Sequence, residues 1–251
     1  NADLVLNEIG IEFRDDQEVL NLLRDAGCDV DGTRVRFPPG IARNLASTAP
    51  SQFTQFARNP SKSVEIGGDK IVFAPVYGPP FIRGLDGERR YAEIDDFINM
   101  VKLVYMLPGL HHSGGTLCEP VDLPVTKRHL EMIYAHIRYS DKPFMGSVTA
   151  PSRAEDSVEM ARLLFGDEFV KNNCVLVSLI NANSPMTWDD TMLGALKVYA
   201  RAGQACIVSP FILAGAMSPV SVAGTLTQIL AEAMSGIALT QIINPGVPVI
   251  F

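Results

Sequence analysis

Cysteine is scarce in this sequence. The 251 residues include four cysteines (Cys28, Cys118, Cys174 and Cys206), and no two of them form a Cys-x-x-Cys pair. Disulfide-stabilised secreted domains and structural zinc sites both need cysteines at close, recognisable spacings. The sequence therefore indicates neither kind of protein, and we predict a reducing cytoplasm as its location.

An excess of positive charge is also missing. Lysine and arginine number 21 against 28 aspartates and glutamates, which gives a net charge of −7. A protein that holds a phosphate backbone needs a basic field, so we exclude nucleic acid as a partner. With 47% apolar and 20% charged residues, the chain is too apolar to be disordered and predicts a globular fold with a large core.

Long apolar runs are absent as well. A membrane span needs roughly 18 apolar residues, and Gly, Pro, Ser or Asn interrupts every candidate, as Gly215 and Ser218-Pro219 do within residues 205–222. We therefore expect no membrane association. No basic leader precedes Asn1, so a signal peptide is absent or already removed. Residues 247–251 read as an uncapped apolar strand, after which we expect further protein.

Familiar catalytic and cofactor motifs are missing too. The sequence has no Gly-x-Gly-x-x-Gly, no Walker loop and no Gly-x-Ser-x-Gly. His111 and His112 are adjacent, so on a strand at most one of them faces the interior, and no second ligand pair stands at metal-binding spacing. His129 and His136 lie among charged residues, which predicts the outer surface of a helix. We predict no metal site and no directly bound cofactor.

Residues 1–66 predict a small α+β extension. The acidic pair Asp15-Asp16 precedes an apolar helical face that Gly27 ends. Asp31-Gly32 stands between two extended runs, which is the strongest short-range signal for a hairpin. Pro38-Pro39 then open a second helix.

Residues 67–92 predict an antiparallel meander. Short extended runs alternate there with turns at Gly67-Gly68-Asp69 and near Asp86-Gly87. Residues 71–77 have a second interpretation, as the first strand of the parallel sheet that follows. Hydrophobic periodicity does not separate the two.

Helices and buried strands alternate over residues 93–251. Strand-like runs recur at intervals of roughly 30 to 40 residues, the length of a βα unit, and begin near His111, Phe144, Cys174, Cys206 and Val247. Apolar residues at helical spacing predict a helix from Ile94 ahead of these runs. Capping and proline signals predict that the helices between the runs start near Pro124, Ser152, Thr187 and Ser218-Pro219. Such a chain forms a parallel sheet, either a closed (β/α)₈ barrel or an open doubly wound sheet.

The missing nucleotide motifs argue against the open sheet. Five strands, or six with residues 71–77, are too few for a closed barrel. We therefore predict an α/β protein with an incomplete (β/α)₈ TIM-type barrel over residues 93–251, the N-terminal portion of a larger barrel. Its open edge needs further chain or a second copy to cover it, so we expect a homo-oligomer.

Function in either architecture sits where strands end, and the segments at those places are polar or small. They are residues 111–115, 146–149, 181–184 and 209–211. Helix caps and turns explain about half of these residues. Trp188 follows one segment, and with Phe211 and Tyr77 it could form aromatic faces that hold an alkylammonium cation. Packing between helices is the alternative for Trp188.

Several longer motifs resemble one family. They are Glu119-Pro120-Val121-Asp122-Leu123-Pro124, Asp141-Lys142-Pro143-Phe144-Met145-Gly146, Asn183-Ser184-Pro185-Met186-Thr187-Trp188-Asp189, Ala202-Gly203-Gln204, Ser209-Pro210-Phe211, Ala214-Gly215-Ala216 and Gln241-Ile242-Ile243-Asn244-Pro245-Gly246. In this order they resemble the trimethylamine methyltransferase family over nearly the whole chain. The likeness is densest from Glu119 onward.

That resemblance implies a (β/α)₈ barrel that moves a methyl group from a methylated amine to the cobalt of a separate corrinoid protein. It implies a longer chain, and a corrinoid carried by the partner rather than by this protein. Some members contain pyrrolysine and use trimethylamine, whereas others demethylate quaternary amines such as glycine betaine. The position that separates the two groups lies beyond Phe251.

The resemblance also suggests site residues. We expect Trp188 and Phe211 as aromatic walls, Asn181, Asn183 and Ser209 as polar positioners, and Glu119 as a carboxylate near the rim, where the corrinoid protein docks. A methyl transfer of this kind needs little acid–base chemistry, in keeping with the missing triads and metal clusters. The alternative is a non-catalytic methylated-amine-binding or scaffold protein of the same fold.

Overall fold

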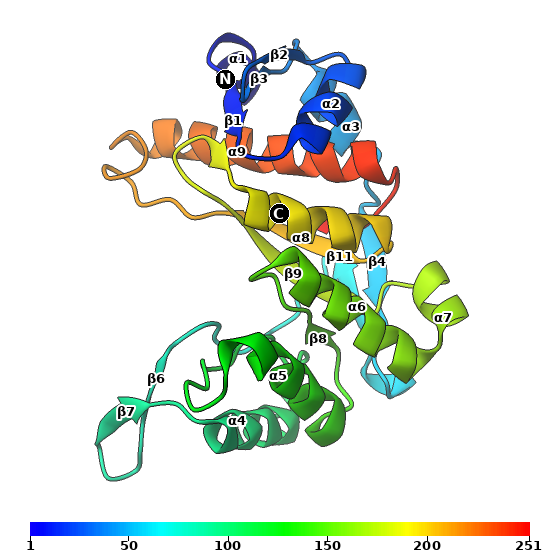
Figure 1. The fold of residues 1–251 in the computed structure, drawn as a ribbon, viewed down its shortest axis with the longest axis vertical. Coiled ribbons are helices and arrows are strands. Elements are labelled where there is room, and N and C mark those ends of the chain that lie inside the picture. Colours follow the sequence, from blue (N-terminus) through cyan, green and yellow to red (C-terminus); the bar gives the residue numbers. More distant parts are fainter. The chain divides into compact units, whose positions relative to one another are not determined.

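The computed structural model describes all 251 residues and divides into two compact units. Unit 1 comprises Asn1–Pro50, Val148–Ser152 and Ser178–Phe251, and unit 2 comprises Ser51–Ser147 and Arg153–Val177. Figure 1 shows the elements of both units. The boundaries expected at residues 66 and 92 stay a prediction.

The N-terminal part of unit 1 contains a small sheet with helices. Its elements are α1 (Ala2–Glu8), β1 (Ile11–Phe13), α2 (Gln17–Asp25), β2 (Asp29–Asp31), β3 (Arg34–Arg36) and α3 (Ile41–Ala46). Asp16 caps α2 by accepting a hydrogen bond from the Val19 amide, and β2 pairs antiparallel with β3 around Gly32, whose φ is +59°. The predicted first helix and the hairpin are therefore confirmed.

The rest of unit 1 has the βα rhythm. Its elements are β9 (Leu176–Ala182), which begins in unit 2, β10 (Thr187–Trp188), α8 (Asp190–Arg201), β11 (Ala205–Pro210), α9 (Val222–Ile243) and β12 (Val249–Ile250). β12 pairs parallel with β11, and β9 is the other neighbour of β11. α9 packs against α1 and α3 as well as α8 and β11, and it lies between the N-terminal elements and α8 (Figure 1). β10 joins the N-terminal sheet as the parallel partner of β1.

Unit 2 combines two antiparallel hairpins with the beginning of a parallel sheet. Its elements are β4 (Gln52–Gln55), η1 (Pro60–Lys62), β5 (Val64–Gly67), β6 (Phe81–Arg83), β7 (Arg89–Tyr91), α4 (Ile94–Met106), α5 (Val125–Tyr139), β8 (Phe144–Met145), most of α6 (Pro151–Phe165) and α7 (Asp167–Asn172). β4 pairs antiparallel with β5 and β6 with β7, whereas β8 pairs parallel with the first residues of β9. Apolar side chains of α4 and α5 fill the core between these two helices.

Two expected strands are absent. Residues 71–77 and the segment near His111 have no strand structure. The two segments contact each other through irregular hydrogen bonds instead, in which the amides of His111 and His112 donate to the Phe73 carbonyl and Gly78 N donates to the Thr116 carbonyl. Pro75 interrupts the first segment and Gly114-Gly115 the second, and such residues weaken the regular donor pattern that a strand ladder needs.

Two helices start at positions other than those predicted, whereas α6 begins at Pro151, next to the predicted Ser152. Asp189 rather than Thr187 caps α8 by accepting from Met192 N. Ser221 rather than Ser218 caps α9. Short capping patterns recur by chance in loops rich in Ser, Thr and Asp, so they locate a helix better than its first residue.

α9 is long and apolar enough, by length and composition, to cross a membrane, contrary to the expectation from interrupted runs. Gly224 and Gly236 stay inside the helix because a single glycine costs a helix only about 1 kcal/mol. Half of the apolar segment is buried within the structure, and core helices of soluble proteins have the same character.

Candidate functional site

The loops after β9 and β11 in unit 1 meet at one pair of side chains on α9. Glu232 accepts hydrogen bonds from Ser184 and Met186 in the loop after β9. Gln228, one turn earlier on α9, donates both to Glu232 and to the Met217 carbonyl in the loop after β11. The two strand-end loops therefore share one anchor.

The loop after β9 is a closed turn built on two polar side chains. The Asn183 side chain donates to Asp189 Oδ2 at 2.8 Å and accepts from the Asp189 amide at 3.0 Å. Asp189 also caps α8, so the turn and the start of α8 are fixed together. The Ser184-Pro185 peptide bond within the turn is cis. Asn183 itself is exposed, which leaves the outer side of the turn open.

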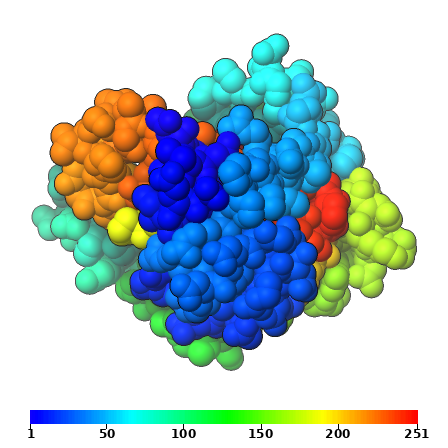
Figure 2. All heavy atoms as spheres, turned by 90° about the horizontal axis from the view of Figure 1, so that it is seen from above, coloured from blue at the N-terminus to red at the C-terminus, as the bar shows by residue number.

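The loop after β11 is exposed and apolar. Phe211 is 67% exposed, and Leu213, Val220 and Val222 are exposed with it. Figure 2 shows this segment in orange at the surface, next to the blue N-terminal residues of unit 1. Ser209 and Asn181, on the strands that lead to the two loops, are half-buried.

Trp188 is not an open aromatic wall. Its side chain is fully buried, and Nε1 donates to Ser235 Oγ at 3.0 Å. Gly236 leaves room for the indole, because a Cβ there would lie 2.6 Å from Cζ2. These contacts correct the expected wall role and agree with the packing alternative: the indole holds β10 against α9.

Glu119 belongs to unit 2, where its carboxylate is bound to Arg128 at 2.7 Å and is about one-third exposed. The Glu119 amide donates to the Pro79 carbonyl, which ties it to the extended segment that contains Tyr77. The Tyr77 ring lies against Gly115, where a Cβ would be 2.7 Å from the ring, and burial raises the pKa of Tyr77. Unit 2 thus has its own aromatic and carboxylate groups beside the end of β8.

The histidines of α5 are buried, contrary to the expected outer surface. His136 Nε2 donates to the Gly115 carbonyl, so Nδ1 accepts from Ser113 Oγ, each at 2.7 Å. Burial lowers the pKa of His136 to about 4. His129 contacts Asp156 at 2.7 Å. The prediction of an outer surface was wrong because the charged residues next to these histidines in the sequence lie on the other face of α5.

His112 and Cys118 are also buried. His112 Nδ1 accepts from the Gly114 amide, its Nε2 contacts Gln55, and burial lowers its pKa to about 3. Burial raises the pKa of the Cys118 thiol to about 12, which leaves it unreactive. Both side chains serve the packing of unit 2.

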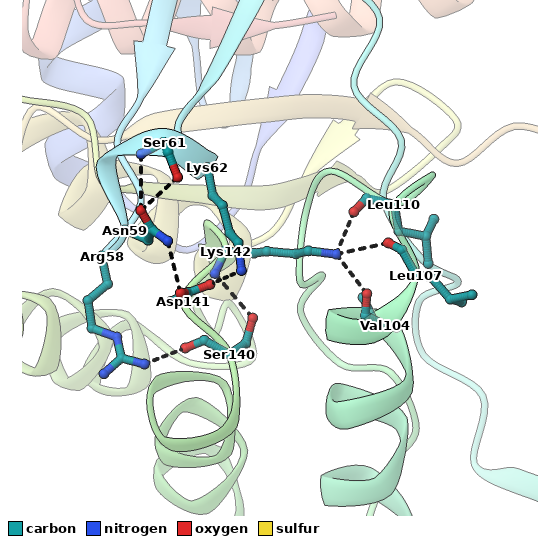
Figure 3. Close-up of polar contacts among 10 residues, drawn as sticks. All are labelled: Arg58, Asn59, Ser61, Lys62, Val104, Leu107, Leu110, Ser140, Asp141 and Lys142. Carbon is teal, nitrogen blue, oxygen red and sulfur yellow. Dashed lines mark hydrogen bonds and ion pairs between the residues drawn. The ribbon is translucent and has the colours of Figure 1, made fainter.

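A pocket of about 400 Å³ lies in unit 2 near the start of β8 and is lined in part by Lys62, Tyr105, His111 and Lys142. Its cations are already bound: Lys62 Nζ contacts Asp141 at 2.5 Å and lies over the Tyr105 ring, and Lys142 donates to three carbonyls of residues 104–110 (Figure 3). The charged groups therefore hold the walls together.

Sequence reasoning missed Glu232 and Gln228. One signal was present, because Glu232 is the only charged residue between Val222 and Ile243. A lone carboxylate in an apolar helix must be buried or functional. This signal was not recognised because residues 222–243 were not predicted to form one continuous apolar helix.

The comparisons with known proteins agree with the motifs. The family model "Trimethylamine methyltransferase (MTTB)" matches residues 1–251. The chain belongs to the trimethylamine methyltransferase family. It is 48% identical to glycine betaine methyltransferase of Desulfitobacterium hafniense, over all of this chain and 52% of that protein.

More distant relatives share the same coverage. Proline betaine:corrinoid methyltransferase of Eubacterium limosum is 28% identical over 98% of this chain and 52% of the relative. Trimethylamine methyltransferase MttB of Methanosarcina thermophila is 24% identical over 96% of this chain and 52% of the relative. The chain spans about half the length of the curated relatives it matches.

Proposed function

We propose that the protein containing this chain moves a methyl group from a quaternary amine of the glycine betaine type to a corrinoid carried by a partner protein. The observation that carries this proposal is the 48% identity, over the whole chain, to a protein named glycine betaine methyltransferase. The corrinoid acceptor is supported by the name of the proline betaine relative. The trimethylamine enzyme is half as similar, which favours a quaternary over a tertiary amine.

The chemistry asks little of the protein. Loss of a methyl group turns a quaternary ammonium into a neutral tertiary amine, so no proton has to reach the leaving group. The corrinoid supplies the nucleophile. The task of this chain is then to bind and orient the amine and to exclude water.

We assign that task to the strand-end loops of unit 1. Phe211 offers an exposed aromatic face for the methylammonium group, and Asn181, Asn183 and Ser209 supply polar groups for the rest of the molecule. Trp188 stiffens the loop from within. Glu119, paired with Arg128 in unit 2, is a rim carboxylate for docking of the corrinoid protein.

We also propose that the chain is part of a (β/α)₈ barrel. The parallel pairs β8–β9 and β11–β12, each joined through helices, support this fold. A homo-oligomer and a cytoplasmic location complete the proposal, and the latter is supported by four buried cysteines that lie far apart in the sequence.

The test uses the full-length protein with the corrinoid protein encoded beside its gene. We expect the absorbance of the reduced corrinoid to change to that of the methylated form with glycine betaine and to change slowly or not at all with trimethylamine. Amine binding without transfer would identify a non-catalytic binding protein. Absence of both with every quaternary amine would overturn the proposal.

A further inference from the structure

Glu232 is a buried charge without a counter-ion. Its side chain is fully buried in α9, among residues that are otherwise apolar or neutral. Its three side-chain partners are the Ser184 hydroxyl at 2.5 Å, the Met186 amide at 2.8 Å and the Gln228 amide at 2.9 Å. None of them is a cation.

These partners are arranged around the carboxyl group as donors. All three donate hydrogen bonds to its oxygens, which therefore act only as acceptors, as the oxygens of a carboxylate do. Neutral donors disperse the negative charge but do not cancel it. In a water-poor surrounding the field of such a charge reaches further than in solution.

The position of this charge matters for the strand-end loops. Ser184 and Met186 follow directly on Asn183, and Gln228 joins Glu232 to Met217 in the loop that Phe211 begins. The carboxylate therefore lies beneath both loops that carry the proposed amine-binding residues. Its side chain is fully buried.

A quaternary ammonium group has no N–H to donate. A protein can recognise its charge only through aromatic faces and through the field of nearby anions. A surface carboxylate would do this poorly, because water and salt screen it. A buried carboxylate under the binding loops avoids that screening.

We propose that Glu232 is the counter-charge for the cationic amine, acting through space from beneath the loops at residues 183–189 and 211–221. Glu232 is thus a positioning and specificity residue that does not touch the substrate. This inference rests on the proposed function, and it adds the group that distinguishes a trimethylammonium group from an uncharged tert-butyl group of the same shape.

The alternative is a purely structural role, in which Glu232 only holds the loops in place. The two roles differ in one measurable respect. A structural defect weakens every ligand of the same shape alike, whereas loss of a counter-charge weakens only the ligand that carries the ammonium charge.

The experiment therefore compares glycine betaine with 3,3-dimethylbutanoate, in which a carbon replaces the charged nitrogen. Dissociation constants are measured by calorimetry for the full-length protein and its variants. In the Glu232→Gln variant we expect the affinity for glycine betaine to fall by about tenfold or more, because the attraction between the two charges is lost. The affinity for 3,3-dimethylbutanoate, an anion that lacks the ammonium charge, should stay the same or rise, because its carboxylate no longer faces a like charge.

Gln228 offers a matched pair of variants that leaves Glu232 in place. Gln228→Lys puts an ammonium group beside the carboxylate and should lower the preference for glycine betaine as Glu232→Gln does. Gln228→Met removes the same hydrogen bond without adding a charge and should keep the preference. This pair decides the question even if Glu232→Gln does not fold.

An unchanged ratio of the two affinities in Gln228→Lys, or in folded Glu232→Gln, overturns the inference. A wild-type protein that binds neither ligand overturns the proposed function itself, so the two failures are distinct.

Discussion

Units 1 and 2 each bury one charged side chain, and the two are held in opposite ways. Lys142 in unit 2 donates to the carbonyls of Val104, Leu107 and Leu110 at 2.7 to 3.0 Å (Figure 3). Glu232 in unit 1 accepts from three neutral donors. Each charge is balanced by dipoles rather than by an ion.

The surroundings give the two charges different roles. Lys142 binds the carbonyls at the end of α4, where the helix dipole is negative, so its charge is compensated locally. Glu232 accepts from two groups of the loop after β9 and from Gln228 on its own helix, so its partners belong to the elements that carry the proposed binding loops. The Lys142 charge lies at a helix end and serves stability, whereas the Glu232 charge lies under loops that a ligand can approach.

Acidification should cause the largest loss of folding stability, and this loss should arise from unit 2. The pKa of His112 is lowered to about 3 and that of His136 to about 4, whereas in the unfolded chain both stay near 6.5. The neutral rings therefore stabilise the fold fully above about pH 6.5, and this stability is lost as the pH falls toward 4. Between pH 6.5 and 5 we expect a loss of about 2 kcal/mol per histidine in urea unfolding.

Two variants separate this effect from general acid sensitivity. His136→Asn should lower the stability at neutral pH but remove about half of the pH dependence, because one of two titrating groups is gone. Leu163→Ala, at an exposed apolar residue, changes no titrating group and should leave the slope as in wild type. An equal slope in all three proteins would show that the buried imidazoles do not control acid stability.

Lys142→Met should destabilise the protein by roughly 3 kcal/mol, because three carbonyls lose their donor while the side chain keeps its apolar length. The midpoint of urea unfolding measures this loss. Lys127→Met, at an exposed lysine, is the control and should cost little. The ratio of glycine betaine to 3,3-dimethylbutanoate affinity should not change in Lys142→Met, and a change there would abolish the contrast with Glu232.

Gly236→Ala should cost about 2 kcal/mol, because the new methyl group overlaps the Trp188 ring and the Val208 side chain. Since Trp188 holds β10 against α9, the loop after β9 should shift and both ligands should bind more weakly. Gly109→Ala, whose Cβ meets open space, is the matched control. Wild-type stability in Gly236→Ala would mean that the indole is packed less tightly than described.

Local signals in the sequence predicted many elements of this fold. The hairpin at Asp31-Gly32, the helix that starts at Ile94 and the strands at Phe144 and Cys206 each carry their own turn, cap or apolar run. The sequence also allowed the family to be identified, because motifs such as residues 183–189 occur in the order that the family shows.

The predictions that were wrong concern side chains whose environment depends on contacts between residues far apart in the sequence. The burial of His136 depends on Ser113 and Gly115, and the role of Trp188 depends on Ser235 and Gly236. The anchor at Glu232 joins α9 to loops more than ten residues away. No periodicity or short motif encodes such pairings, so only the fold could show them.

The most direct test of this account is a crystal structure of the full-length protein with glycine betaine bound. We predict that the trimethylammonium group lies at the loops after β9 and β11, beside Phe211 and above Glu232, with no protein cation between the two charges. An ammonium group bound away from these loops, for instance in the pocket lined by Lys62 and Lys142, would contradict the account.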